Sequence, residues 1–120
     1  MADTTTTVAE LRELVRRFVD ERDWNQFHTP KNLAMSLAIE AAELMEHFQW
    51  LTPEQSQAVA GDAGKLHDVG EELADVLCYA LAMANSLNLD LAEAVRKKMV
   101  RNAAKYPADQ FRGRYGHDDH

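Results

Sequence analysis

The sequence has few of the features that mark secreted or membrane proteins. Its 120 residues include one cysteine, Cys78, which cannot form an internal disulfide; we expect a small buried thiol in a reducing compartment. No apolar run approaches the ~20 residues that span a bilayer. The first seven residues lack the basic and apolar regions of a signal peptide. We therefore expect a cytoplasmic protein with no membrane partner.

Basic residues are also scarce. Lysine and arginine number 13 against 20 aspartates and glutamates, which gives a net charge of −7. This balance argues against a general nucleic-acid binder, because that class needs a basic face. It does not exclude a phosphorylated substrate, since bound metal cations reverse the local sign of an acidic site. We expect no nucleic-acid partner, and a small phosphorylated ligand stays open.

Strand signals, internal repeats and a glycine-rich phosphate loop are missing, which leaves an all-α fold. The length fits one domain, or a compact subunit that completes its core by oligomerising. We expect a single domain over residues 1–120, with its core at about 8–107 and mobile segments at 1–7 and 108–120. Apolar periodicity and capping signals predict the helices of a four-helix bundle at Val8–Arg22, Lys31–Gln49, Asp68–Leu87 and Leu91–Lys105.

Two of these helices carry pairs of acids within apolar runs. Glu40 and Glu43 lie three residues apart on the second helix, and Glu72 and Asp75 repeat this spacing on the third. Residues three apart share one helix face, so two packed helices would bring four carboxylates to one point. Such a cluster suits a hard divalent cation, Mg²⁺ or alternatively Mn²⁺.

The position of Glu40 favours a metal site over surface charge. On a helical wheel it falls inside the apolar stripe of the second helix, where an unpaired carboxylate is costly to bury. A salt bridge to a lysine or arginine of a neighbouring helix would satisfy it equally well, and this alternative stays open. On the third helix Glu72 and Asp75 share a flank with Tyr79, while Glu71 points to the other side.

Aromatic and cationic side chains occur where they could hold a nucleotide. The connector before the second helix contains Trp24, Phe27 and His28, which either cover the core or form a wall on which a nucleobase stacks. The apolar stripe of the fourth helix becomes polar and basic at Lys98 and Asn102. These side chains either reach solvent or form a rim for phosphates.

Three functions compete on these patterns. A metal-dependent hydrolase of nucleoside triphosphates would use Mg²⁺ to polarise phosphoryl oxygens and to generate a hydroxide nucleophile. A di-iron carboxylate bundle is disfavoured, because it uses Glu-x-x-His, and the residues three before His47 and His67 are Leu44 and Gly64. In a helical interaction module the acids would be surface charge only, which the position of Glu40 argues against.

The chain also resembles a known family. Glu-x-x-Glu at 40–43 followed by Glu-x-x-Asp at 72–75 resembles the metal motif of the all-α MazG-like nucleoside triphosphate pyrophosphohydrolases, and most of all their dCTP pyrophosphatase branch. The similarity covers roughly residues 8–107. The segments that carry it are Glu21–His28, Phe48–Trp50, Glu71–Tyr79 and Asn102–Pro107.

The resemblance implies an enzyme that hydrolyses a (d)NTP between the α and β phosphates and so cleanses the nucleotide pool. Its leading substrate would be dCTP or a 5-modified dCTP, with broad dNTP or NTP use as the alternative. It would assemble as a homotetramer, a dimer of dimers with sites at subunit contacts. The implied catalytic and metal-binding residues are Glu40, Glu43, Glu72 and Asp75. The implied substrate contacts are Trp24, Trp50 and Tyr79 to the base and Lys98, Asn102 and Tyr106 to phosphates, with His28 of the aromatic connector beside them.

One position departs from the family pattern. The dCTP-specific members carry a histidine near the base in the first helix, and the matching residue here is Val15. Valine cannot hydrogen-bond a cytosine edge, and a site built around a ligand's polar groups discriminates far better than an apolar wall does. The choice between cytosine and a wider set of bases therefore stays open.

Overall fold

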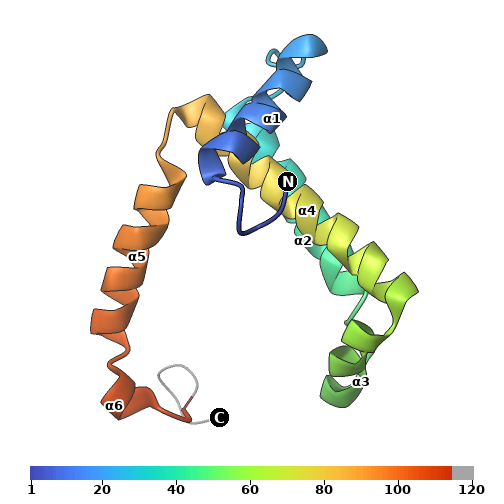
Figure 1. The fold of residues 1–120 in the computed structure, drawn as a ribbon, viewed down its shortest axis with the longest axis vertical. Coiled ribbons are helices and arrows are strands. Elements are labelled where there is room, and N and C mark those ends of the chain that lie inside the picture. The colour runs from blue at the N-terminus through green and yellow to red at the C-terminus, as the bar shows by residue number, and fades with distance from the viewer. Residues whose placement is uncertain (115–120) are drawn as a thin grey trace. The chain divides into compact units, whose positions relative to one another are not determined.

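The computed structural model describes residues 1–114, and all its elements are helices (Figure 1). In chain order they are α1 (Val8–Glu21), α2 (Pro30–Glu46), α3 (Pro53–Ala58), the 3₁₀ turn η1 (Val59–Gly61), α4 (Ala63–Leu87), α5 (Leu91–Lys105) and α6 (Ala108–Phe111). No strand occurs among these 114 residues, so the predicted all-α class is confirmed for them. Of the expected C-terminal tail, residues 108–111 form α6 and residues 115–120 lie outside the described part of the chain.

Polar side chains fix where the helices begin. The Thr7 hydroxyl accepts a hydrogen bond from the Glu10 amide at 3.1 Å, and the Glu10 carboxylate accepts one from the Thr7 amide at 3.3 Å. Such caps satisfy amides that have no partner within the helix. The N-caps of α2 to α5 are again threonines or aspartates, namely Thr29, Thr52, Asp62 and Asp90. The predicted fourth helix is confirmed at both ends, since it runs from Leu91 to Lys105.

The helix predicted to start at Asp68 is longer than the pattern indicated. It begins at Ala63, where the Asp62 carboxylate accepts a hydrogen bond from the Lys65 amide at 3.1 Å. Gly64, which comes before the predicted start at Asp68, is therefore part of the helix. A glycine inside a helix costs about 1 kcal/mol, and a side-chain cap is worth about as much, so Gly64 does not prevent the first turn from forming.

Residues 1–89 form one compact unit. Within it α2 packs antiparallel along α4, and α1 packs against α4 (Figure 1). The side chain of Leu33 is fully buried, and the other buried apolar residues of this unit are Val19, Val59, Leu81, Ala82 and Ala84. The core is narrow, and several large apolar side chains on α2 and α4 remain exposed. A second unit begins at Asp90 and contains α5 and α6.

The C-terminal end of α4 is held by Arg12 of α1. Its guanidinium donates hydrogen bonds to the Asn85 side chain at 2.9 Å and to the carbonyl oxygens of Leu89 and Ala84 at 2.7 and 3.2 Å. The Asn85 amide nitrogen donates in return to the Arg12 carbonyl oxygen at 3.0 Å. Because the last carbonyls of a helix have no intrahelical partner, one arginine both caps α4 and ties α1 to it.

Arg12→Ala is expected to destabilise the fold by about 2 kcal/mol, because hydrogen bonds from charged donors are worth ~1.5–3 kcal/mol and the helix-end carbonyls lose their partner. In a thermal melt followed by circular dichroism this loss lowers Tm by about 8–16 °C. The matched control is Arg17→Ala on the same helix, which removes an exposed ion pair to Glu13 at 3.3 Å. Surface pairs are worth about 0–1 kcal/mol, so equal melting of the two variants would contradict the role of Arg12.

None of the helices among residues 1–114 combines the length and the apolar composition needed to cross a bilayer.

Candidate active site

Three acids predicted from the sequence meet between α2 and α4. They are Glu40 on α2 and Glu72 and Asp75 on α4, and one potential ligand atom of each lies within 4.8 Å of the others. The antiparallel packing of the two helices produces this meeting, since the three acids come from two segments more than thirty positions apart in the sequence. The structure therefore places an oxygen-rich cluster in the unit formed by residues 1–89.

Two oxygens of this cluster lack partners. The Oε2 atoms of Glu40 and Glu72 are buried and have no hydrogen-bond partner among residues 1–114. None of the ion pairs within that range involves either residue, so the salt bridge considered for Glu40 is not formed there. Buried carboxylate oxygens without partners are costly. A hard divalent cation such as Mg²⁺ would satisfy them, and the donor set fits its preference for oxygen ligands.

Crowding of these acids changes the protonation of Glu40. The adjoining Glu72 carboxyl, then burial, then the neighbouring Glu43 and Asp75 raise the pKa of Glu40 from its ordinary value of 4.5 to about 7. Glu43 is exposed and lies outside the three-residue group, yet it acts on Glu40 directly. An acid whose charge is this unfavourable is a typical component of a cation-binding or catalytic site.

A cavity of about 470 Å³ adjoins the cluster, because Glu40 and Asp75 form part of its wall. Most of the remaining wall is apolar, and the side chains come from α1, from the connector after it and from α4. Besides the two acids, the cavity is lined by Leu14, Val15, Phe18, Val19, Trp24, His28, Cys78, Tyr79 and Ala82. A largely apolar chamber that ends at carboxylates suits a ligand with a flat apolar part and a charged part.

Three of the predicted base contacts line this cavity and one does not. Trp24, His28 and Tyr79 are wall residues. The Trp24 ring packs edge-on against Phe18, with centroids 5.6 Å apart, which sets the orientation of the indole. Trp50 is 86% exposed in the turn after α2 and does not contribute to the wall. Phe27, the other aromatic of the connector, is 60% exposed and also lies outside the wall, so Trp24 and His28 are the connector's contribution.

Cys78 corrects one expectation from the sequence. The thiol was expected to be buried in the core, but Cys78 is exposed and lines the cavity. Partial burial, followed by the charge of Asp75, raises the pKa of this thiol. Val15 was placed near the base by the family resemblance, but the other α1 residues of the wall were missed as site residues, because their apolar stripe reads as core. Nothing in the sequence separates Leu14 or Phe18 from core residues.

The predicted phosphate contacts belong to the second unit. Lys98 is exposed on α5, and the Asn102 side chain donates to the Met99 sulfur at 3.7 Å. The Tyr106 ring packs edge-on against Phe111, with centroids 5.2 Å apart. The side chains of Lys98 and Asn102 project from one α-helix and are separated by four positions, so they share a face. Their contact with phosphate stays a prediction.

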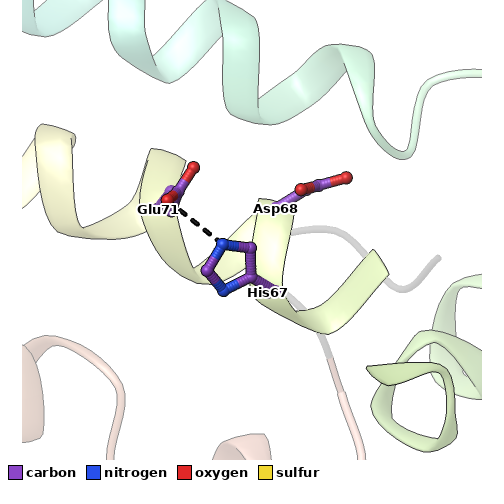
Figure 2. Close-up of side chains that lie close together, drawn as sticks. All are labelled: His67, Asp68 and Glu71. Carbon is purple, nitrogen blue, oxygen red and sulfur yellow. Dashed lines mark ion pairs between the residues drawn. The ribbon is translucent and has the colours of Figure 1, made fainter. Parts of the chain in front are cut away.

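A second group of possible ligands lies on α4 alone. His67, Asp68 and Glu71 are exposed, and the His67 Nε2 atom is 3.2 Å from a Glu71 carboxylate oxygen (Figure 2). This is the spacing at which one helical turn pairs exposed charges. Glu71 is therefore an exposed surface residue, while its neighbour Glu72 belongs to the acidic cluster, as the helical wheel predicted.

The chain is similar to several known proteins. The model of the MazG-like family matches residues 35–116. The chain is 40% identical over 107 residues to dCTP pyrophosphatase 1 of Bos taurus and 41% identical over 102 residues to that of Homo sapiens. The alignments cover 89% and 85% of this chain but 63% and 60% of the two relatives, so it spans somewhat under two thirds of their length.

One solved structure is also similar over most of its length. A pyrophosphatase from Archaeoglobus fulgidus DSM 4304 is 40% identical and has a TM-score of 0.75. The alignment covers 89% of this chain and 98% of that one.

Proposed function

The chain belongs to the MazG-like family, and from this membership we propose that it hydrolyses a deoxynucleoside triphosphate to the monophosphate and pyrophosphate. The family resemblance deduced from the acidic motifs is confirmed by the match. The observation that carries the proposal is the pair of buried, unpartnered carboxylate oxygens on Glu40 and Glu72, in an acidic cluster that adjoins an apolar cavity through Glu40 and Asp75. The relatives named above are called pyrophosphatases, which supports the same chemistry.

The acids would bind the metal, and the aromatic residues of the cavity wall would bind the base. Glu40, Glu72 and Asp75, with Glu43 beside them, would hold Mg²⁺ or Mn²⁺. The bound ion would polarise the phosphoryl oxygens and lower the pKa of a water molecule. Trp24 and Tyr79 would hold the base in the cavity, and Lys98, Asn102 and Tyr106 would contact the phosphates. Holding the two ends of the substrate fixes the scissile bond relative to the acids, and such positioning is itself a large part of phosphoryl-transfer catalysis.

We further propose dCTP, or a dCTP modified at position 5, as the preferred substrate. The support is that the curated relatives are named dCTP pyrophosphatases. The alternative is broad use of dNTPs or NTPs, because Val15 contributes only methyl groups to the cavity wall. Equal kcat/KM across a panel of dNTPs that includes 5-methyl-dCTP would favour the alternative.

The deciding experiment is analysis of products by anion exchange after incubation of the protein with Mg²⁺ and dCTP. dCMP with pyrophosphate is the expected result. dCDP with orthophosphate would mean attack at the γ phosphate and would contradict the proposal. If no dNTP is hydrolysed although the protein still binds metal, the proposed activity is contradicted and a non-catalytic helical binding module is favoured.

Trp24→Ala is expected to raise KM by about 10-fold or more with little change in kcat, because stacking of a base on an aromatic ring is worth ~1–3 kcal/mol. The effect should be measured by steady-state kinetics with the best substrate from the panel. Phe27→Ala is the matched control, since Phe27 belongs to the same connector but lies outside the cavity wall. An unchanged KM for Trp24→Ala would contradict stacking on the base and would mean that the indole only packs against Phe18.

We also propose that the chain assembles as a homotetramer, a dimer of dimers. The support is the narrow core of residues 1–89 and the apolar side chains left exposed on the two long helices. Met35 and Ile39 on α2 and Leu73 and Leu77 on α4 are between 46% and 58% exposed. Exposed apolar clusters of this kind favour burial against another copy. Size-exclusion chromatography with light scattering is expected to give four times the 13.6 kDa chain mass, and a monomer would contradict the assembly.

A further inference from the structure

The Asp20 carboxylate joins the last turn of α1 to the connector that follows this helix. One of its oxygens accepts a hydrogen bond from the Asn25 amide nitrogen at 2.7 Å, and the other accepts one from the Arg16 guanidinium at 3.0 Å. Arg16 lies one turn earlier on α1, where it also donates to Glu13 at 2.8 Å. Hydrogen bonds to an ionised acceptor are shorter and stronger than neutral ones. Asp20 is therefore a fixed point on α1 to which the connector is attached.

The connector begins with a backbone conformation that needs outside support. Asp23 has a φ of 54°, in the left-handed region that residues other than glycine rarely adopt. The chain turns back there, and the Trp24 amide donates to the Val19 carbonyl oxygen at 3.1 Å. Residues in such conformations persist where the surrounding structure holds them. The hydrogen bond between Asp20 and Asn25 spans this turn, because the two residues lie on either side of Asp23.

The turn that this hydrogen bond spans also carries Trp24. The indole lines the 470 Å³ cavity and packs edge-on against Phe18. Trp24 is still 41% exposed and Phe18 is 48% exposed, so burial in a core does not hold the two rings. The place of the indole in the cavity wall therefore depends on the backbone of the turn, and Asn25 is the next residue of that backbone.

Asp20 is close to the candidate site without belonging to its wall. Together with Arg16 and Asn25 it lines a neighbouring cavity of about 310 Å³, and none of these three residues lines the larger cavity. A ligand in the larger cavity would touch Trp24 but not the Asp20 carboxylate. Any effect of Asp20 on that ligand is therefore indirect and passes through the turn.

We propose that Asp20 is a positioning residue, which holds Asn25 and thereby places the Trp24 indole in the cavity wall for substrate binding. The inference rests on the proposed function, in which Trp24 packs against the base. The Asp20 side chain is 42% exposed, so loss of its hydrogen bond should loosen the turn without unfolding the chain. Small misplacements of groups that hold a substrate are sufficient to change its kinetics. The expected consequence is weaker substrate binding at unchanged stability.

A double-mutant cycle tests whether Asp20 acts through Trp24. Steady-state kinetics with Mg²⁺ and the best dNTP should compare the wild type, Asp20→Ala, Trp24→Ala and the double variant. Asp20→Ala is expected to raise KM by about 3–10-fold, with kcat within about a factor of two of the wild type. In the Trp24→Ala background the same change should leave KM unaltered, because the indole that Asp20 positions is absent. An unchanged KM for Asp20→Ala, or effects that multiply in the double variant, would overturn the inference.

Two further variants separate the hydrogen bond to the connector from the other contacts of Asp20. Asn25→Ala removes this hydrogen bond but leaves the ion pair of Asp20 with Arg16, and it should raise KM as much as Asp20→Ala does. Glu21→Ala is the matched control, since this neighbouring acid is 70% exposed and pairs with Arg22 at 3.7 Å. It should keep the KM of the wild type. A normal KM for Asn25→Ala would contradict the proposed role of Asp20.

A measurement without turnover distinguishes failure of this inference from failure of the proposed function. In a Trp50→Phe background Trp24 is the one tryptophan left in the sequence. Time-resolved fluorescence anisotropy should show larger fast motion of its indole in Asp20→Ala and Asn25→Ala than in Glu21→Ala. If no dNTP is hydrolysed but this difference is seen, the proposed function fails and the positioning of Trp24 by Asp20 is supported. Equal anisotropy decays in the three variants would overturn the inference, whether or not the protein hydrolyses dNTPs.

Discussion

Replacing Glu72 with glutamine is expected to lower magnesium-dependent hydrolysis of the preferred dNTP by about a thousand-fold or more, because a metal ion supplies several kcal/mol of charge stabilisation and each 1.36 kcal/mol is a factor of ten in rate. Glutamine has nearly the same shape, and the buried oxygen that lacks a partner in the wild type becomes part of a neutral amide. The fold should therefore persist, and circular dichroism should show unchanged helix content.

The adjacent residue provides the control. Glu71→Gln removes a carboxylate of the same type from the same helix, but Glu71 is exposed and pairs with His67 at 3.2 Å (Figure 2). Its activity should stay within about a factor of two of the wild type, since exposed pairs of this kind are worth about 0–1 kcal/mol. Parallel measurements of kcat/KM and of Mg²⁺ affinity separate the two positions. Normal turnover by Glu72→Gln would remove Glu72 from the metal site.

The difference between these neighbours was predictable because a helix converts sequence spacing into direction. Glu72 and Asp75 are three apart and fall on one flank, and Glu40 lies within an apolar stripe, so the sequence alone indicated the three acids that meet, although it also added Glu43, which lies outside the group. The helix that starts at Leu91 was predictable for a similar reason, since its Asp90 cap is a local signal. Local rules were therefore sufficient for these three acids and for that helix.

Which aromatic and apolar residues line the cavity could not be predicted from local sequence patterns, because this depends on contacts between distant segments of the chain. Val15 and Phe18 line the cavity only because α1 packs on the end of α4, an arrangement that Arg12 fixes through Asn85 and the α4 carbonyls. No spacing in the sequence reveals a contact between residues seventy positions apart. The same limit explains why Trp24 and Trp50 looked equivalent in the sequence, although one of them lines the cavity and the other is 86% exposed.

The crowded acids also predict an unusual dependence of stability on pH. The pKa of Glu40 is raised from 4.5 to about 7, so between these values the folded protein binds a proton that the unfolded chain releases. Stability falls with rising pH wherever the folded state binds more protons. The stabilisation from protonated Glu40 is therefore fully present below pH 4.5 and is lost as the pH rises through about 7. Without divalent metal, the Tm contribution of this group should decline over that window and level off above it.

Magnesium is expected to reverse this trend, because a cation binds the deprotonated carboxylates and so its affinity increases with pH. A ligand at 100 times its Kd stabilises the folded state by about 2.7 kcal/mol, which corresponds to roughly 10 °C in a small domain. The rise in Tm on addition of Mg²⁺ should therefore be about 10 °C at pH 8 and much smaller at pH 5.5, as measured by differential scanning fluorimetry.

Glu40→Gln isolates the responsible group. It should remove the decline in Tm between pH 4.5 and 7 that is seen without metal, and it should also weaken the magnesium-induced rise at pH 8. Glu46→Gln changes an exposed acid of the same helix and should leave both effects in place. Parallel pH curves for Glu40→Gln and the wild type would assign the proton to another group. Loss of the metal-free slope with a full magnesium response would keep Glu40 as the titrating acid but exclude it as a metal ligand.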